Sequence, residues 1–344
     1  MPSPKRPPGP LVVGEPMEAR RRGYRQQKAA PPERGLPLAN LTQSMSQPAT
    51  EPASVPTLRH VPRRYLALGL IIVAICLLGA LILVRDNAGP STTSTVETFT
   101  PAPSSLVSTI TSVPASVYDA VGVSSPDNPV QPLRPAGNGN GPLWLATVAG
   151  GPPQPVVFFY GAEFAPYAAV QRWPLILALS RFGTFKQLGL MQSSATTAFA
   201  DLSTFTFWNV SYTSKYLILE SVERYSSLNP TGGRYLGLQK PNARQAAAIA
   251  SYGASPTTFA LTDVANRYVL NGSSFAPGVL AGLSQSQIAG NLATPASPLT
   301  QAVVSAANDV TAGICAVDGD KPETVCESKG VLAADDALKI TPPH

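Results

Sequence analysis

Apolar residues form one long uninterrupted run in this chain and shorter periodic patterns after it. The long run extends from Tyr65 to Val84, between Arg63-Arg64 and Arg85-Asp86. A helix rises ~1.5 Å per residue, so this run is about 30 Å long and matches the hydrocarbon core of a bilayer. It lies far from the first residue, and no small-x-small cleavage pattern follows it, which disfavours a cleaved signal peptide. The pattern predicts one transmembrane helix over residues 63–86.

The segment before this run is polar, basic and rich in Pro, Gln and Ser. Residues 1–62 hold too few large apolar side chains to offset the entropy of ordering, so we expect a disordered tail. Eleven basic and four acidic residues precede the apolar run. This bias predicts a single-pass protein of the plasma membrane with a cytoplasmic tail and an extracytoplasmic C-terminal part.

The charge of the chain argues against a nucleic-acid partner. The net charge of the whole chain is +5, which is less than that of the basic tail, so the part after the apolar run is slightly acidic. A nucleic-acid interface needs a basic face on the folded part. We therefore expect no nucleic-acid partner. The partner that the sequence predicts is the lipid bilayer, which the apolar run from Tyr65 to Val84 would span.

The next segment, residues 87–142, is predicted to be an extracytoplasmic linker. It begins with a Ser-, Thr- and Pro-rich stretch that is typical of an extended tether. From residue 104, apolar side chains recur at intervals of three and four, and Pro114 interrupts them. This pattern predicts two short amphipathic helical turns.

Strand and helix patterns alternate from residue 143 to residue 340, the predicted folded domain. They indicate a hairpin over 143–148 and 156–160, a helix over 166–182, and strands over 188–192, 204–212 and 216–222. A helix over 243–251, strands over 257–264 and 267–270, and helices over 278–283, 285–292 and 300–314 follow. Such an order predicts an α/β sandwich around a mixed sheet.

Two of these elements carry finer expectations. Leu175, Leu179 and Phe182 mark the buried face of the helix over 166–182, and Pro174 inside it should bend the axis. The alternation from Thr204 to Val210 predicts threonine and asparagine on an exposed face, with aromatic residues or valine on the buried one.

The junction between the strand over 156–160 and the next helix carries the most specific motif. It reads Phe158-Phe159-Tyr160-Gly161-Ala162-Glu163-Phe164-Ala165-Pro166-Tyr167-Ala168, with Arg172-Trp173 shortly after it. This stretch resembles a bacterial membrane-anchored family known as domain of unknown function 929. Typical members are similar to thioredoxin and have Cys-Pro-Tyr-Cys where this chain has Ala165-Pro166-Tyr167-Ala168.

The resemblance covers roughly residues 143–340 and implies a thioredoxin-like fold without redox activity. In such folds the helix N-terminus stabilises an attacking thiolate. Alanine at both cysteine positions cannot perform that chemistry. The resemblance also implies a cis-proline facing these positions, and the alignment puts Ala260 there, whereas the residues alone favour Pro256.

Other catalytic machinery is missing from the sequence of the folded part. Histidine occurs only at positions 60 and 344, which excludes histidine-based catalysis and histidine metal sites there. Gly150-Gly151 and Gly232-Gly233 lack the spacing of a nucleotide-binding loop. We expect no cofactor, no metal and no enzymatic activity.

Three cysteines remain, and two of them are predicted to pair. Cys76 lies within the apolar run, where it suits helix packing. Cys315 and Cys326 flank a polar turn in the extracytoplasmic part, and two nearby thiols in an oxidising compartment favour a structural disulfide. The alternative is a thiol-disulfide oxidoreductase or isomerase that acts through this pair.

The remaining candidates are two carboxylates and one surface. Glu163 and Asp263 could act as buried acids, but a lone carboxylate is more often solvated or capping. Phe164, Pro166 and Tyr167, with Trp173, form an apolar peptide-binding surface or part of the core. The leading hypothesis is a membrane-anchored pseudoenzyme that binds an extracytoplasmic protein or serves as a structural envelope module.

Overall fold

The computed structural model describes residues 98–124, 130–136, 142–148, 150–228, 232, 234–254 and 260–339. The tail over 1–62, the apolar run from Tyr65 to Val84 and the alternative proline, Pro256, lie outside these residues. None of the helices within the described ranges has both the length and the apolar character needed to span a bilayer.

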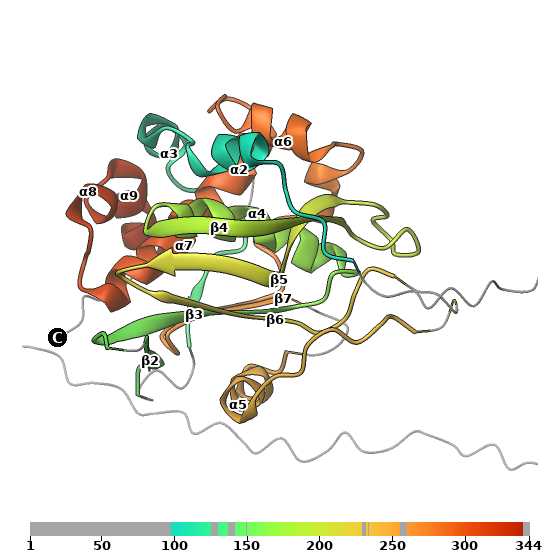
Figure 1. Cartoon of the computed structure of the whole chain (residues 1–344). Helices are drawn as coiled ribbons and strands as arrows, with labels where there is room; N and C mark the ends of the chain where they lie inside the picture. The colour runs from blue at the N-terminus through green and yellow to red at the C-terminus, as the bar shows by residue number, and fades with distance from the viewer. Residues whose placement is uncertain are drawn as a thin grey trace, which may run out of the picture. The chain divides into compact units, whose positions relative to one another are not determined.

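A mixed sheet forms the centre of the structure (Figure 1). Strand β3 (Pro153–Gly161) pairs in parallel with β6 (Ile218–Glu223) and antiparallel with β7 (Ala260–Val264). Strand β8 (Tyr268–Asn271) pairs with β7, and two short strands, β1 (Arg134–Pro135) and β2 (Leu145–Thr147), pair with β8 and β3. The α/β class with a mixed sheet is thus confirmed.

A second, two-stranded antiparallel sheet is formed by β4 (Gly183–Gln192) and β5 (Ser203–Ser214). The segment just before the first helix pairs with the outer edge of β4. The Ala102 amide donates to the Leu188 carbonyl at 2.8 Å, and the Leu190 amide donates to the Thr100 carbonyl at 2.7 Å. The end of the predicted tether is therefore part of the fold rather than a free coil.

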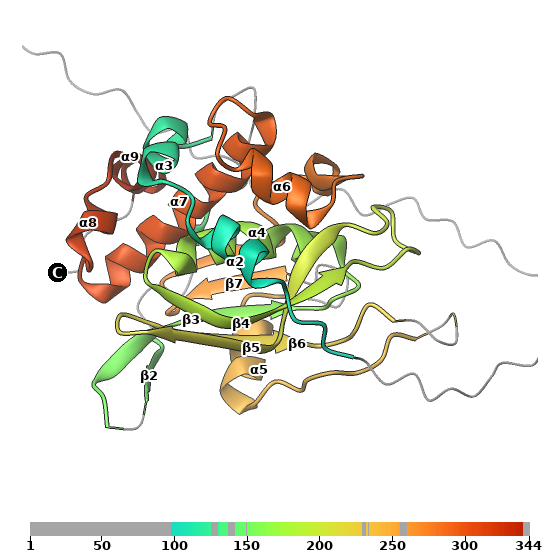
Figure 2. The same cartoon turned by 45° about the horizontal axis from the view of Figure 1, so that its top comes forward.

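Helices cover both sides of the central sheet (Figures 1 and 2). On one side α4 (Pro166–Ser180) packs against α7 (Pro298–Asp318), while α5 (Ala243–Ser251) lies on the other side. The shorter helices are α2 (Ser104–Thr111), α3 (Ala115–Val121), η1 (Pro277–Leu280), α6 (Gln285–Asn291), α8 (Glu323–Cys326) and α9 (Lys329–Leu338).

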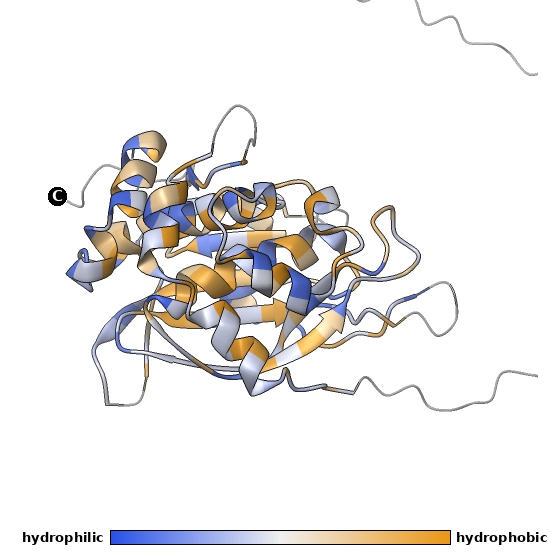
Figure 3. Ribbon diagram, turned by 90° about the horizontal axis from the view of Figure 1, so that it is seen from above, coloured by the Kyte–Doolittle hydropathy of each residue, from blue (hydrophilic) through white to orange (hydrophobic). Residues whose placement is uncertain are grey.

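The core lies between the sheet and the layer formed by α4 and α7, which pack on each other. Hydrophobic and hydrophilic residues are interspersed along the ribbon of the domain (Figure 3). All residues of β3 from Val156 to Gly161 are buried, as are those of α4 from Ala168 to Leu179. A strand that is apolar on both faces is typical of a central strand covered on both sides. The expected buried positions Leu175, Leu179 and Phe182 are confirmed, although α4 is enclosed on all sides.

Several predicted elements differ from the structure. Strand β4 begins at Gly183 rather than at residue 188, and the helix expected over 278–283 is the short 3-10 helix η1. Helix α7 extends to Asp318, and helix α8 lies within the polar turn expected between Cys315 and Cys326. Helix α9 follows in a stretch for which the sequence patterns predicted no element. The prediction that the threonines of β5 lie on an exposed face was wrong, because Thr204 and Thr206 are buried.

Candidate binding site at the head of helix α4

The segment Ala165-Pro166-Tyr167-Ala168 lies where β3 ends and α4 begins. Ala165 is the N-cap residue of α4 and Pro166 occupies the first turn, where a proline costs no helical hydrogen bond. The Ala165 amide donates to the Ala162 carbonyl at 3.1 Å, which closes the turn between strand and helix. Ala165 and Ala168 are both buried. Their methyl groups offer neither a nucleophile nor a ligand atom at this helix N-terminus.

Ala260, the position that the resemblance assigns to a cis-proline, lies beside this junction. It is the first residue of β7 and pairs with Gly161 at the end of β3. A Cβ added to Gly161 would lie 3.3 Å from the Ala168 Cβ, so Gly161 lies between β7 and the head of α4. In the described residues the cis peptide bond precedes Pro322.

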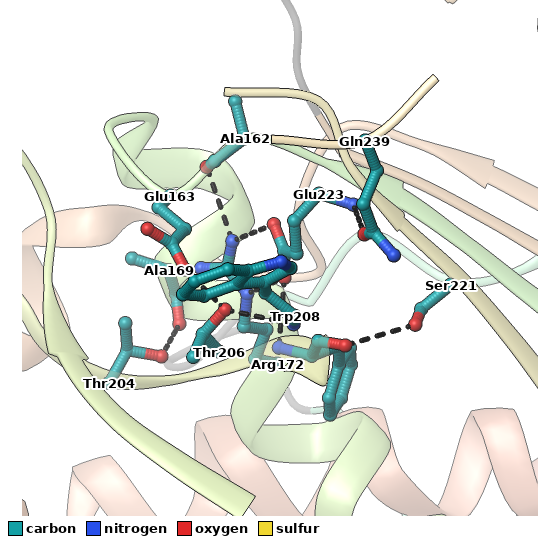
Figure 4. A network of polar contacts seen from close by, with 11 residues as sticks. Ala162, Glu163, Ala169, Arg172, Thr204, Thr206, Trp208, Ser221, Glu223 and Gln239 are labelled. Carbon is teal, nitrogen blue, oxygen red and sulfur yellow. Dashed lines mark hydrogen bonds and ion pairs between the residues drawn. The ribbon is translucent and has the colours of Figure 1, made fainter. Parts of the chain in front are cut away.

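A buried ion pair supports the junction from below (Figure 4). Arg172 of α4 donates from Nε and Nη2 to the two Glu223 carboxylate oxygens, at 2.8 and 2.7 Å, and both side chains are fully buried. The same Nη2 also donates to the Ala162 carbonyl at 3.2 Å. The Phe207 amide donates to Glu223 Oε1, and the Glu223 amide donates to Gln239 Oε1. One charged pair thus joins α4, β5, β6 and the junction.

Glu163 belongs to the same buried polar group. Its Oε1 accepts a hydrogen bond from the Thr206 hydroxyl, and its side chain is 2% exposed. The neighbouring Thr204 hydroxyl donates to the Ala169 carbonyl at 2.6 Å. Of the interpretations left open for Glu163, the solvated one is excluded, because the carboxylate is buried. The two threonines face inward because their hydroxyls satisfy a carboxylate and a carbonyl of the junction.

The residues of the predicted apolar surface differ in their exposure. Tyr167 is 42% exposed, while Trp173 is fully buried and donates from Nε1 to the Ser203 carbonyl. Phe164 stacks on Tyr235 with ring centroids 3.9 Å apart, in nearly parallel planes. Phe164, Pro166, Tyr167 and Tyr235 are called the aromatic rim below. Sequence reasoning missed Tyr235, because no local pattern ties it to residue 164.

The cysteine pair lies away from this rim. The Sγ atoms of Cys315 and Cys326 are bonded, which links the end of α7 to α8. Helix α8 lies at the opposite end of the domain from the loop between β4 and β5 (Figures 1 and 2). The aromatic rim is at that loop, because the Ser194 amide donates to the Phe164 carbonyl. The disulfide and the head of α4 are therefore separate features.

The second candidate acid, Asp263, lies on β7 and is fully buried. Its Oδ1 accepts a hydrogen bond from the Asn266 amide at 2.8 Å, so it caps the turn to β8. Burial raises the pKa of Asp263 to about 7. Within the described ranges no cluster of three or more His, Cys, Asp or Glu side chains could hold a metal ion.

A comparison with protein families gives a match for the part of the chain that contains the junction between β3 and α4. Residues 150–239 match the family model described as domain of unknown function (DUF929). This match covers β3, α4, β4, β5 and β6, and it confirms the family resemblance over these residues. Neither the curated proteins nor the solved structures gave a match.

Proposed function

We propose, from the match of residues 150–239 to this uncharacterised family, that the chain carries a thioredoxin-like domain that binds a protein instead of exchanging disulfides. The observation that carries the proposal is the pair Ala165 and Ala168 at the head of a helix that follows a central strand. A helix placed in this way is the thiolate-stabilising part of a thioredoxin-like site. The antiparallel strand that starts at Ala260 supports the same assignment.

The proposal makes the domain a pseudoenzyme. Both positions that would exchange electrons are methyl groups, and the cysteines that remain among the described residues are bonded at the far end of the domain. They are also buried, at 4% and 5% exposure. A buried structural disulfide favours a stabilising role over the alternative of an oxidoreductase that works through Cys315 and Cys326.

The proposed location is outside the plasma membrane, with Tyr65 to Val84 as the anchor. Two features support it. The charge bias of residues 1–64 favours a cytoplasmic tail, and a disulfide between Cys315 and Cys326 suits an oxidising compartment. The partner would then be an extracytoplasmic protein or an envelope assembly.

The aromatic rim is the proposed contact surface. Tyr167 is one of few large apolar side chains exposed among the described residues, and it lies on the first turn of α4. Phe164 and Tyr235 are held in place by their stacking, so the rim offers rigid aromatic area. Rigid aromatic side chains give contact area at a low cost in side-chain entropy.

The assignment of the fold is tested by Ala165→Cys with Ala168→Cys in the full chain. Positions three apart at a helix start bring their α-carbons within about 6 Å, which a disulfide can bridge. We expect a reducible disulfide between the new cysteines, or a gain of insulin-reductase activity, neither of which the parent protein shows at this site. Two thiols that stay free under oxidising conditions would contradict the thioredoxin-like assignment.

The binding role is tested by a photo-crosslinking residue in place of Tyr167 in living cells, with Leu332 as the matched position. Leu332 is 49% exposed on α9 and lies outside the rim. We expect one discrete crosslinked protein from position 167 and none from position 332. With the crosslinked protein purified, Tyr167→Ser should weaken its binding by about tenfold, as expected for a central aromatic anchor. Equal crosslinking from both positions would contradict the proposal.

A further inference from the structure

A groove lies between helix α2 and strand β4, beside the segment that pairs with the edge of β4 (Figures 1 and 2). Its walls come from three parts of the chain, namely residues 101–102 before α2, the helix itself, and residues 185–188 of β4. Its volume is about 450 Å³, which is within the range of small-molecule sites. The groove therefore has the size of a ligand site, and the chemistry of its lining decides which ligand it fits.

The walls of the groove are held in place by the fold. The Ala102 amide donates to the Leu188 carbonyl at 2.8 Å, which fixes the segment before α2 on β4. Phe99 of the same segment packs edge-to-face on Trp208, with ring centroids 6.2 Å apart. Ile110 anchors α2, because its side chain is fully buried. A groove that is already formed spares a ligand the entropic cost of ordering its walls.

Apolar side chains form one part of the lining and are open to a ligand. Pro101 is exposed, and Ala102 and Val107 are half-buried. Phe185 and Leu188 are buried and complete the apolar part from the β4 side. An alkyl chain in the groove would remove the three reachable side chains from water, which is favourable.

Hydrogen-bond donors form the other part of the lining. Lys186 of β4, together with Ser104 and Ser108 of α2, is exposed. Among the described contacts, none of these three side chains has a hydrogen bond or an ion pair, so a ligand can reach all three. None of the residues that line the groove is acidic, so no lining side chain compensates the charge of Lys186. An ammonium group brings three donors and a positive charge, and the groove therefore favours an anionic head group.

We propose that this groove binds a small amphipathic anion, an alkyl chain that ends in a carboxylate or a phosphate. The alkyl chain contacts Pro101, Ala102 and Val107, and the anionic head accepts hydrogen bonds from Lys186 and from the serine hydroxyls. Inorganic phosphate lacks the apolar part, and a cationic amphiphile would meet an uncompensated lysine. The site shares no residue with the aromatic rim, so it is independent of the proposed function.

The test is photo-labelling of the full chain in nanodiscs of zwitterionic lipid. The probes carry a diazirine on the same decyl chain and differ only in the head group, which is a carboxylate, a phosphate, an alcohol or a trimethylammonium. Mass spectrometry of fragmented peptides locates each modified residue. We expect an anionic probe to label residues 101–111 or 185–188 about tenfold more than the neutral and cationic probes, because only its charge complements Lys186.

Two further arms separate a bound ligand from simple partitioning and identify its source. Unlabelled decanoate should displace the label, because a site saturates whereas partitioning into lipid does not. Labelling by the carboxylate alone indicates a fatty acid, whereas labelling by the phosphate indicates the head group of a single-chain phospholipid. Either result supports the amphipathic anion.

Two pairs of variants test the lining, and the thermal unfolding of each variant verifies that it is folded. Lys186→Gln should weaken labelling about tenfold, as expected for the loss of a charged hydrogen-bond donor. Lys215→Gln, which changes an exposed lysine that lies over the Tyr216 ring, should leave labelling unchanged. Ser108→Trp fills the groove and should abolish labelling, whereas Ser105→Trp places the same side chain at an exposed position of α2 outside the lining.

Four results would overturn the proposal. They are the absence of label in the groove, equal labelling by the neutral or cationic probe, label that unlabelled decanoate does not displace, and labelling that persists in both Lys186→Gln and Ser108→Trp.

Discussion

Arg172 shows at the scale of one residue how the junction is held. Its guanidinium is fully buried, makes a two-pronged contact with Glu223 and lies 5.4 Å from the centre of the Phe159 ring. Such a pair contributes little net free energy over apolar residues of equal size, but the loss of one partner leaves an uncompensated buried charge. The pair therefore fixes where α4, β5 and β6 meet.

We predict that Arg172→Gln destabilises the protein by about 3–5 kcal/mol, because Glu223 then stays buried without its cation. The control is Lys321→Gln, which removes the exposed ion pair between Lys321 and Glu323 and should leave stability almost unchanged. Urea unfolding of the full chain measures both. Equal effects of the two variants would show that the buried pair does not hold the junction.

At the scale of elements, the contact between β3 and α4 depends on a position without a side chain. A Cβ on Gly161 would lie 2.6 Å from atoms of the Phe159 ring. That ring cannot move aside cheaply, because it is fully buried and packs edge-to-face on Phe207 at 5.2 Å. The absence of a side chain at Gly161 thus allows the end of β3 to pack closely against the first turn of α4.

Gly161→Ala should therefore destabilise the protein by about 1–3 kcal/mol through overpacking. Gly290→Ala in α6 is the matched change, because the added Cβ meets nothing within 4 Å and alanine favours a helix by ~0.5–1 kcal/mol over glycine. Thermal unfolding should shift in opposite directions for the two variants. A gain of stability in both would exclude the tight contact at Gly161.

At the scale of the whole molecule, buried carboxyls make stability depend on pH. Burial raises the pKa of Asp263, Asp309 and Asp318 to about 7 in each case. Between pH 4 and 7 the folded protein therefore holds protons that the unfolded chain has released. The free energy of unfolding falls as the pH rises through this window and levels off above it.

Asp309→Asn should raise the free energy of unfolding at pH 8 by about 1–3 kcal/mol, because a buried ionised carboxyl is removed. The gain should shrink as the pH falls to 4, because the folded carboxyl is then protonated and the unfolded one is close to its ordinary pKa of 3.8. Urea unfolding at pH 4, 6 and 8 measures this trend. A gain that is the same at every pH would contradict a raised pKa at Asp309.

The course of the sheet and its helices could largely be predicted from the sequence. Strand β3, helix α4 and helix α5 follow from apolar periodicity and flanking polar residues. The burial of Thr204 and Thr206 could not be predicted. The alternation along β5 does not show that a carboxylate and a carbonyl lie on the inner face and accept hydrogen bonds from these hydroxyls. Period-two patterns report the faces of a strand and not what covers them.

The sequence by itself determined which chemistry is missing at the helix head, because alanine at 165 and 168 excludes a thiol in any fold. It also determined that the cysteines outside the apolar run are close enough along the chain to pair. Only the tertiary structure decided that Arg172 meets Glu223 and that Tyr235 stacks on Phe164. Those partners are far apart along the chain and meet because the elements that carry them pack together. Local sequence patterns do not report this packing.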